Sequence, residues 1–497
     1  MVLYVKMNSG KTNMKKYLKG RERKMIKNKV RKICRTMRMS RYNFLVRDRE
    51  DNLIIYNFLT GITSLVKIMK LDTDMFSNLF LKAPVIYGSD CEKYMDLTEK
   101  LLELGILIDA DVNEGIMYNA KSYEEIYDNK LYLTILPTGK CNFNCSYCLE
   151  SEQSFSREKM SVRAQNAILK FVQKNIHKYN EVHVSWFGGE PLLETSIIEH
   201  MSKKLIQICK LRCIPYSAQV TTNGYLLDND TLEMLYKQRI YEFMITVDGF
   251  KEQHDRFRSM HNGEGTYDTI MQNLINIRDN KYYRFAHITI RVNITRDVLN
   301  SIDDFITYID SLFSGDPRFT FLFIPAVNYS KIKPTDELFA SAQEVLERLN
   351  SNSLYMDKLF NKNANTELIT PTANCPASLK NSYVIASDLR VYKCDAHYDM
   401  EDNCIGFIDM DGNMMIDEVL HGKWYLTSEF LNRTYDGCVG CFYRPACPIG
   451  GRNCPYKYLA NIQESITCPV KTDGFTEILK RKVLDVADRF TCYVVSF

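Results

Sequence analysis

An α/β fold is predicted for this chain of 497 residues, with a partial barrel of six parallel strands at its centre. Between residues 131 and 327, apolar runs of strand length alternate with amphipathic stretches of helix length, a pattern typical of parallel strands with helices outside. Several of these strands end in short polar or glycine-containing motifs, as expected where a barrel binds a ligand at the carboxyl ends of its strands. Six units rather than eight favour a barrel that is open on one side.

The elements of this core follow in order along the chain. The predicted strands are Leu131–Pro137, Glu181–Phe187, Ser217–Thr222, Glu242–Asp248, Phe285–Ile294 and Phe319–Ala326. Helices between them are predicted at Ser161–Lys174, Ser196–Leu211 and Tyr267–Arg278. Ahead of the core, Tyr42–Arg47 and Leu53–Phe58 flank a turn and predict a hairpin. Two helices, Thr73–Leu81 and Cys91–Leu104, and a short strand, Gly105–Asp109, complete a small module.

Five segments result from this reading. We expect a basic N-terminal extension over residues 1–40, the small module over 41–125, the barrel core over 126–330, a helical connection over 331–370 and a cysteine-rich domain over 371–497. More than one domain is expected because single hydrophobic cores rarely grow beyond about 250–300 residues.

The composition argues against a membrane-spanning protein and against a secreted disulfide-rich protein. Hydrophobic and charged contents of 45% and 25% are ordinary for a globular protein. No apolar run approaches the roughly 18 residues of a transmembrane helix. The 16 cysteines accompany no signal peptide, and many are clustered at metal-ligand spacings, which favours a reducing, cytoplasmic location over a disulfide scaffold.

The basic charge of the chain is concentrated at one end. Residues 1–38 carry 14 Lys and Arg and one acid, a net charge of +13, so the remainder carries 3 − 13 = −10. Such an arm can bind nucleic acid or an anionic membrane, but it lacks interleaved aromatic residues and no nucleic-acid-binding fold follows. We therefore expect neither partner, and favour a solvated tail or a true start at Met37 or Met39.

Three cysteines directly after the first strand carry the most chemical information. Cys141, Cys145 and Cys148 have the spacing Cys-x3-Cys-x2-Cys. Three thiolates on one loop can bind three irons of a 4Fe–4S cluster, which leaves the fourth iron free for a small molecule. A structural zinc site requires four ligands, so this triad fits zinc poorly.

Three further motifs close the next strands: Gly188-Gly189-Glu190-Pro191, Thr222-Asn223-Gly224 and Thr246-Val247-Asp248-Gly249, the last followed by His254-Asp255 and Arg258. With the cysteine triad, this set resembles the radical S-adenosylmethionine (SAM) enzymes. The resemblance implies that Gly188, Gly189 and Glu190 bind the SAM amino group. It also implies that Thr246 and Arg258 hold the SAM carboxylate and that Tyr147 neighbours the adenine.

A second set of cysteines lies in the C-terminal third. Its spacing resembles the SPASM domain, which carries auxiliary iron–sulfur clusters. The resemblance implies one cluster on Cys438, Cys441, Cys447 and Cys468, and another on Cys375, Cys394 and Cys454. Two departures are a longer loop before Cys454, which weakens its assignment, and Leu389 where the family usually has glycine.

Seven thiolates cannot fully ligate two 4Fe–4S clusters. An open iron, a contribution from Cys404 and a non-cysteine ligand all remain possible completions. The pair Cys438-x2-Cys441 is also compatible with a zinc ribbon.

Polar residues beside these cysteines are candidates for proton transfer and binding. Asp395 follows Cys394 directly, and an aspartate at this place is the proposed general base of the sulfatase-maturing enzymes, which this sequence also resembles. A solvated loop acid or helix cap is the alternative. Arg291 and Asn293 alternate on the fifth strand and are expected on one barrel face, either in contact with SAM or substrate or buried with structural hydrogen bonds.

Taken together, the resemblance implies a radical SAM/SPASM peptide maturase. A 5′-deoxyadenosyl radical would modify a ribosomally made precursor peptide, with a thioether or other crosslink as the expected product. The small N-terminal module resembles winged-helix-like domains in which a leader peptide adds to a sheet edge; a packed extension without a binding role is the alternative. A reductant such as flavodoxin or ferredoxin is the other expected partner. An anaerobic sulfatase-maturing enzyme that forms formylglycine remains an alternative, and a metal-bearing binding protein without enzymatic activity is a second one.

Overall fold

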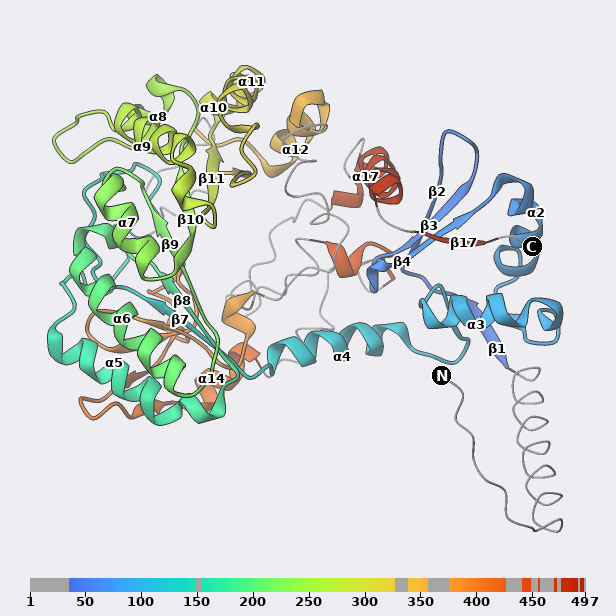
Figure 1. Cartoon of the computed structure of the whole chain (residues 1–497), viewed down its shortest axis with the longest axis horizontal. Helices are drawn as coiled ribbons and strands as arrows, with labels where there is room; N and C mark the ends of the chain where they lie inside the picture. The colour runs from blue at the N-terminus through green and yellow to red at the C-terminus, as the bar shows by residue number, and fades with distance from the viewer. Residues whose placement is uncertain are drawn as a thin grey trace, which may run out of the picture.

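The computed structural model describes residues 35–148, 150, 153–326, 338–355, 375–425, 440–447, 455, 469–471, 475–489 and 492–495. The chain forms two lobes, and helix α4 (Glu114–Ile126) extends from one to the other (Figure 1). One lobe holds the barrel core, and the other holds the N-terminal module.

All six core strands that were predicted are present. They are β7 (Lys130–Ile135), β8 (Glu181–Trp186), β9 (Tyr216–Thr222), β10 (Ile240–Thr246), β11 (His287–Ile294) and β12 (Phe319–Pro325). They lie side by side in sequence order, and every neighbouring pair is parallel. Along β7 and β8, fully buried and half-buried residues alternate strictly, so one face of the sheet packs beneath helices while the other lines the barrel.

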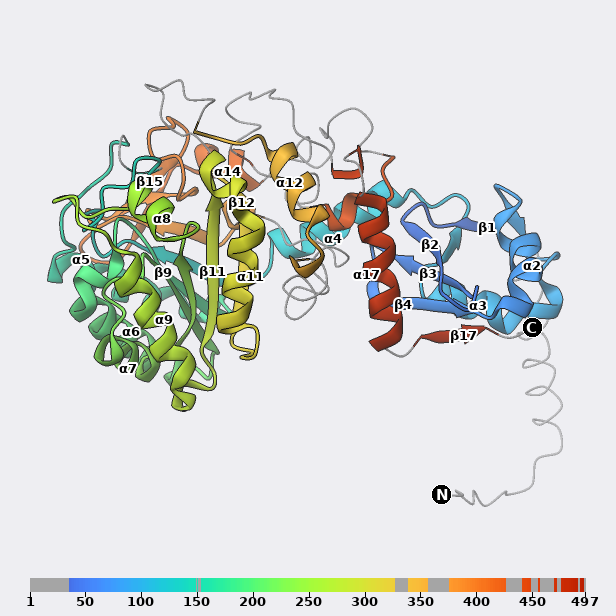
Figure 2. The same cartoon turned by 90° about the horizontal axis from the view of Figure 1, so that it is seen from above.

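Helices return the chain between these parallel strands, as right-handed crossovers require. They are α5 (Val162–Asn175), α6 (Thr195–Leu211), α7 (Asn229–Lys237), α9 (Tyr267–Asp279) and α11 (Ile302–Phe313), and they cover the outer face of the sheet (Figure 2). The three predicted helices correspond to α5, α6 and α9. Because the strands all point the same way, their carboxyl ends and the loops that follow meet at one mouth.

The strand order continues past β7 into the C-terminal third of the chain. Strand β13 (Ser382–Ile385) pairs in parallel with β7, and β14 (Arg390–Tyr392), β15 (Cys404–Ile408) and β16 (Met414–Ile416) follow as antiparallel neighbours. This extension covers the β7 edge that a six-stranded sheet would leave unpaired. The sequence pattern did not reveal this pairing, which brings the start of the cysteine-rich segment against the barrel.

The N-terminal module contains two small sheets. One has the order β5-β1-β6 and is formed by β1 (Thr36–Met39), β5 (Ile86–Tyr87) and β6 (Leu107–Asp109). The other contains the predicted hairpin, β2 (Asn43–Arg47) and β3 (Leu53–Asn57), extended by β4 (Gly61–Ile68). Helix α2 (Thr73–Phe76) with the π-helical turn Ser77–Leu81, and helix α3 (Met95–Glu103), lie in the two predicted helical stretches.

Strands β1 and β4 were not predicted. Strand β1 lies within the segment that we expected to be an N-terminal extension, and Met37 in it is 1% exposed. A chain that started at Met37 or Met39 would therefore lose one or three of the four residues of a strand that pairs on both sides.

The last described elements of the chain return to the N-terminal module. Helix α17 (Phe475–Arg489) packs Phe475, Leu479 and Val483 against the hairpin, and β17 (Tyr493–Val495) pairs in parallel with β4. Both elements were expected in the cysteine-rich domain over 371–497. The local sequence of a strand does not reveal a pairing partner that lies some 400 residues away.

Only part of the predicted helical connection is described, and it contains helix α12 (Ala342–Ser351). Within the described ranges, no helix is both long enough and apolar enough to cross a membrane.

Candidate functional site

The three cysteines of the triad lie on the loop that leaves β7 at the mouth of the barrel. None of the three forms a disulfide among the described residues, and all three are half-buried. The loop is fixed against the segment that follows α8 (Lys251–Phe257): the Asn144 N–H donates to the Ser259 carbonyl at 2.9 Å, and the Ser146 N–H donates to the Phe257 carbonyl at 3.0 Å. The cysteine loop is thus held between the ends of the first and fourth strands.

The chemistry of these thiols fits a cluster. Burial raises the pKa of Cys141 to about 12 and that of Cys145 to about 11, and the charge of Cys148 adds to both increases. Iron binds the thiolate form and displaces the proton. No three His, Cys, Asp or Glu side chains among the described residues surround a single ion. A 4Fe–4S cluster needs no such arrangement, since each cysteine binds a different iron.

Glycines after β8 allow the backbone to pass very close to the cysteine loop. Gly188 has φ +114°, and a Cβ atom there would lie 2.5 Å from the Thr138 carbonyl oxygen. A Cβ atom on Gly189 would lie 2.3 Å from the Lys140 carbonyl oxygen. These contacts are too short for any side chain, so both positions require glycine while the loop keeps this path.

Hydrogen bonds of Glu190 link the loop after β8 to the end of β9. Its side chain is 1% exposed and accepts hydrogen bonds from Leu192 N at 2.9 Å, Thr222 Oγ1 at 2.7 Å and Asn223 N at 2.7 Å. Burial raises the carboxyl pKa, and these hydrogen bonds oppose that increase. The Glu190 N–H also donates to the Lys140 carbonyl at 2.8 Å, which ties this carboxylate to the cysteine loop.

A second polar cluster forms at the ends of β10 and β11. The Tyr147 hydroxyl donates to the Asp248 carboxylate and accepts from Arg258 Nη1 at 3.0 Å and from Asn293 Nδ2 at 3.3 Å. The Asn293 N–H donates to Asp248 Oδ1 at 2.7 Å. Thr246, at the end of β10, is 8% exposed beside this cluster and pairs in register with Arg291. The structure therefore brings Tyr147, Thr246 and Arg258 to the same end of the sheet.

Arg258 retains an unused donor. Its side chain is 8% exposed, and its Nε has no hydrogen-bond partner among the described residues. A buried, unpaired N–H is costly, so this atom is suited to an acceptor supplied by a ligand.

Two residues of the same motif support Arg258 rather than facing the mouth. His254 accepts a hydrogen bond from the Asp248 N–H at its Nδ1, at 3.1 Å, and its Nε2 lies 3.1 Å from Thr266 Oγ1. Burial lowers the pKa of His254, which keeps the imidazole neutral. Asp255 Oδ1 accepts from the Thr266 and Tyr267 N–H groups and so caps α9. Sequence spacing alone did not distinguish these supporting residues from those that face a ligand.

Asn142 and His261 were missed by the sequence analysis. Asn142 Oδ1 accepts from Asn223 Nδ2 at 2.8 Å, and His261 Nε2 lies 3.1 Å from the Cys141 carbonyl oxygen. Both fix the cysteine loop. His261 carries no recognisable motif, and Asn142 is marked only by its place between two cysteines.

Asp395 lies on a loop that packs against the continuation of the cysteine loop. Gln153 Nε2 donates to the Ala396 carbonyl at 2.8 Å, and the rings of Phe155 and Tyr398 stack at 4.3 Å. The Asp395 side chain is accessible to solvent, yet the surrounding protein raises its carboxyl pKa, and the charge of Arg291 opposes this increase. Asp395 thus lies directly after Cys394, on a loop that packs against the segment that follows the triad.

Glu150 is a carboxylate that the sequence analysis did not identify. Its side chain is 5% exposed, and its Oε1 has no partner among the described residues. Burial raises its pKa to about 8; the charge of Arg157 opposes this increase, and that of Asp395 adds to it. The charges of Glu150 and Asp395 therefore affect each other, and Glu150 lies two residues after Cys148 of the triad.

The predicted auxiliary-cluster ligands are only partly described. Cys375 and Cys394 pack in the main core cluster, whereas Cys404 packs in a separate cluster with Tyr392 and Tyr398. Cys441 and Cys447 lie against the N-terminal module, where Phe442 stacks on Phe44 at 5.7 Å. Cys438, Cys454 and Cys468 lie outside the described residues.

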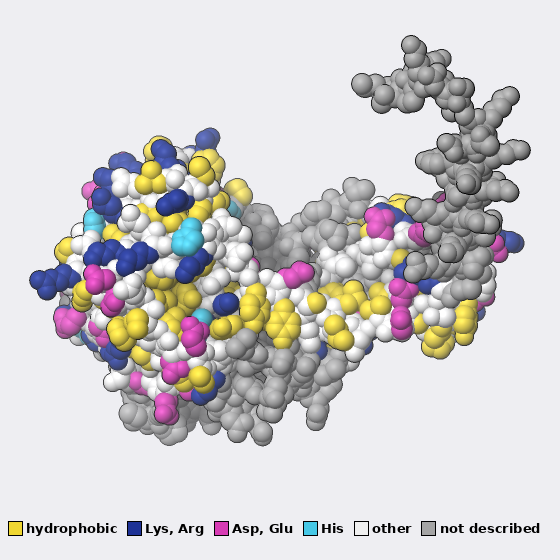
Figure 3. Space-filling view, turned by 90° about the horizontal axis from the view of Figure 1, so that it is seen from below, with side chains coloured by type: hydrophobic (Ala, Val, Ile, Leu, Met, Phe, Trp, Pro, Cys, Tyr) yellow, Lys and Arg dark blue, Asp and Glu magenta, His cyan; other side chains and the backbone are white. Residues whose placement is uncertain are grey.

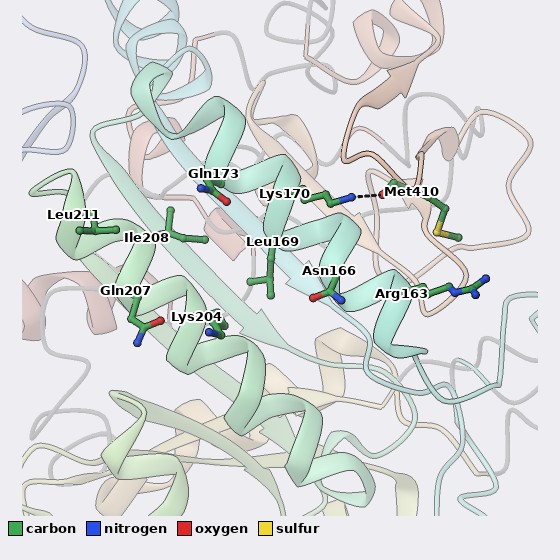
Figure 4. A pocket seen from close by; sticks show the side chains of 10 residues that line it. All are labelled: Arg163, Asn166, Leu169, Lys170, Gln173, Lys204, Gln207, Ile208, Leu211 and Met410. Atoms are coloured by element: carbon green, nitrogen blue, oxygen red, sulfur yellow. Dashed lines mark hydrogen bonds between the residues drawn. The ribbon is translucent and has the colours of Figure 1, made fainter.

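A surface groove of about 660 Å³ lies on the outer wall of the barrel and contains none of the predicted site residues. It runs between α5 and α6, with Leu169 and Ile208 along it and Arg163, Lys170 and Lys204 around it (Figure 4). Basic side chains gather on this lobe in the view from below (Figure 3). The groove is separated from the mouth by the sheet and carries no part of the site.

Comparison with known proteins agrees with this geometry. Residues 135–307 match the model of the Radical SAM superfamily. The GTP 3',8-cyclase of Clostridium botulinum is 32% identical over 132 residues, which are 27% of this chain and 39% of the length of that relative. The chain therefore spans less than half of that enzyme.

Two further similarities extend over more of this chain. The cysteine-type anaerobic sulfatase-maturating enzyme of Clostridium novyi is 24% identical over 343 residues, 63% of this chain and 86% of that protein. The solved structure of native anSMEcpe with bound AdoMet and Kp18Cys peptide matches with a TM-score of 0.56 and 17% identity, over 73% of this chain and 100% of that one. At this identity the structural match shows a shared fold.

Proposed function

Because residues 135–307 match the Radical SAM superfamily, we propose that this chain is a SAM-dependent enzyme that modifies a ribosomally made peptide. One observation carries the proposal: the cysteine loop, Glu190 and the cluster of Tyr147, Asp248 and Arg258 meet at the carboxyl ends of the parallel strands. A metal-binding protein without enzymatic activity would give these polar groups no common purpose.

Cys141, Cys145 and Cys148 are proposed to hold a 4Fe–4S cluster. The backbone at Gly188 and Gly189, with Glu190, would receive the SAM amino group, while Thr246 and the free Nε of Arg258 would hold its carboxylate. Tyr147 would lie beside the adenine. When bound, the cluster and SAM supply an electron and a 5′-deoxyadenosyl radical, which removes a hydrogen atom from the substrate. The residues of this chain orient SAM and exclude water.

The cysteine-rich segment is proposed to hold two auxiliary clusters. Cys438, Cys441, Cys447 and Cys468 would ligate one, and Cys375, Cys394 and Cys454 the other. Cys404 packs in a different cluster from Cys375 and Cys394, which favours an open iron or a non-cysteine ligand over Cys404 as the completing ligand. Asp395, accessible and next to Cys394, would accept the proton of a substrate thiol.

A thioether crosslink is the proposed product. Forming its S–C bond removes a proton from a cysteine thiol and a hydrogen atom from a carbon of the same peptide, and one electron passes to an auxiliary cluster. A flavodoxin or ferredoxin would supply the electron that cleaves SAM. The N-terminal module, proposed as winged-helix-like, would bind the leader of the peptide. In support, a peptide is bound in the solved structure that shares this fold.

Formylglycine formation in a sulfatase is the second candidate. It is favoured by the similarity to the Clostridium novyi enzyme over 63% of this chain and by the position of Asp395. The N-terminal module is the feature that this candidate leaves without a role.

Product mass separates the two candidates. The reconstituted enzyme, SAM and dithionite are incubated anaerobically with a cysteine peptide from a sulfatase or with a short cysteine-rich precursor encoded beside this gene. A thioether removes two hydrogen atoms and leaves sulfur in the peptide, whereas formylglycine formation removes the sulfur. Asp395→Asn should reduce product while deoxyadenosine still forms. If neither peptide changes while SAM is cleaved, both peptide substrates are wrong.

A further inference from the structure

The chain places its own C-terminal strand on an edge of the N-terminal module. In the sheet of order β17-β4-β3-β2, β17 occupies the outer position beside β4 (Figure 2). The pairing is parallel, with Tyr493 opposite Val66, Val494 opposite Lys67 and Val495 opposite Ile68. An extended segment from the far end of the sequence therefore completes this sheet.

The side chains of β17 show that the strand lies in a groove between β4 and α3. Val495 is 2% exposed and packs in a cluster with Val66, Ile68 and Leu101, the last of which is on α3. The Nζ of Lys100, also on α3, lies 5.8 Å from the centre of the Tyr493 ring. Val494, between them, is 54% exposed. Val495 thus points into the groove and Val494 out to solvent, while Tyr493, which is 36% exposed, lies at the edge of the groove.

The attachment of β17 is slight. It comprises three residues, and one of them is fully buried. Backbone pairing at a sheet edge depends little on side-chain identity, so another extended segment with an apolar residue in the place of Val495 can make the same contacts. A tethered strand keeps its position largely because its effective concentration is high, on the order of millimolar for short flexible tethers.

We propose that the groove between β4 and α3 is a binding site for an extended peptide segment, and that β17 is its displaceable resident strand. The proposal rests on the peptide substrate of the proposed function and adds how access to it is controlled. The fitting segment carries an aromatic residue where Tyr493 lies and an apolar residue two positions later. On binding, the peptide segment would replace β17 beside β4, and the other strands of the sheet would keep their pairing.

Strand exchange can be measured without knowledge of the natural peptide. The probe is a fluorescein-labelled synthetic peptide with the sequence of residues 491–497, and the protein is a variant chain that ends at Thr491. Anisotropy should show binding to the shortened chain at least about tenfold tighter than to the full chain, where the tethered strand competes. A peptide with Val495→Asp should lose this binding, because the charge would enter the apolar cluster. The matched peptide with Val494→Asp should keep it.

A second pair of variants tests the full-length chain. Val495→Asp should release β17, so that the amides of Val66–Ile68 exchange hydrogen faster and the wild-type peptide binds. Val494→Asp should leave both properties unchanged. Equal binding of the two variant peptides, or no binding by either the shortened chain or full-length Val495→Asp, would overturn the proposal. None of these measurements needs iron or SAM, so a failure of SAM cleavage would count against the proposed function and not against strand exchange.

Discussion

Tyr147 and Asp248, 101 residues apart in the sequence, are joined by a hydrogen bond that closes the cysteine loop onto the end of β10. Asp248 is fully buried and also accepts from the backbone of Asn293 on β11. Through this one carboxylate, the loop that carries the three cysteines is fixed to the two strands on the far side of the proposed SAM site. Burial raises the pKa of Asp248, and the charge of Arg258 and the Tyr147 hydrogen bond oppose that increase.

Tyr147→Phe removes this hydrogen bond and the acceptor for Arg258 Nη1. Leaving a buried polar group unpaired costs about 1–3 kcal/mol, so we expect SAM affinity to fall roughly tenfold or more and thermal stability to decrease. Equilibrium dialysis with labelled SAM measures the affinity. Tyr236→Phe, at a tyrosine on the outer aromatic cluster, is the matched control and should bind SAM normally. Equal affinities in the two variants would show that the Tyr147 hydroxyl has no part in the site.

Gly189→Ala should disrupt the cysteine loop. The new Cβ atom would lie 2.3 Å from the Lys140 carbonyl oxygen and 2.7 Å from that of Gly139, and backbone atoms cannot move away cheaply. We expect iron content after reconstitution and the rate of deoxyadenosine formation both to fall more than about tenfold, since reacting groups must be held within fractions of an ångström. Gly315→Ala, where nothing lies within 4 Å of the added atom, should behave as wild type. Full iron loading of Gly189→Ala would show that the loop has room to move.

The buried side chain of His421 should make the free energy of unfolding depend on pH. Burial, together with the charge of Lys393, lowers its pKa to about 4 from 6.5. The folded state binds the proton less well than the unfolded state, so this stability is present above about pH 6.5 and is lost as the pH falls towards 4. His421→Gln removes the titrating group, and the free energy of unfolding in urea should then vary less between pH 7 and pH 5, by up to about 2 kcal/mol. Parallel pH profiles for both proteins would contradict this assignment.

Leu389 combines backbone strain with a buried side chain. Its φ of +69° is a region that favours glycine, yet its side chain is 3% exposed in the main core. Relief of the strain in Leu389→Gly is worth about 1–2 kcal/mol, but the lost packing costs about 2–5 kcal/mol, so we expect net destabilisation of about 2 kcal/mol. Cys213→Gly is the control: φ is +53° and the side chain is exposed, so strain relief should stabilise it slightly. If Leu389→Gly were the more stable protein, strain would outweigh packing at this turn.

Much of this architecture follows from patterns that are local in the sequence. The six core strands could be predicted because each is an apolar run followed by a helix, and the order of parallel strands then follows from short crossovers. The residues at the mouth could be named because Gly188, Glu190 and Arg258 fall at or soon after strand ends. Asn142 and His261, which fix the cysteine loop, could not be named, since they carry no signal beyond their position.

Long-range pairing was the part that sequence patterns did not reveal. Strand β13 joins β7 across about 250 residues, and β17 joins β4 across more than 400, and nothing local in either short strand identifies its partner. Leu389 is the instructive exception. A departure from the expected glycine was visible in the sequence, and the structure shows the positive φ that explains why glycine is usual there.

SAM cleavage tests the central claim most directly. The protein is reconstituted anaerobically with iron and sulfide, reduced with dithionite and given SAM, and 5′-deoxyadenosine is quantified for wild type and for Cys145→Ala. We predict deoxyadenosine from wild type, none from Cys145→Ala, and iron that includes one 4Fe–4S cluster on the triad in addition to any auxiliary clusters. Zinc in place of iron, with no deoxyadenosine from the wild-type protein, would contradict the account.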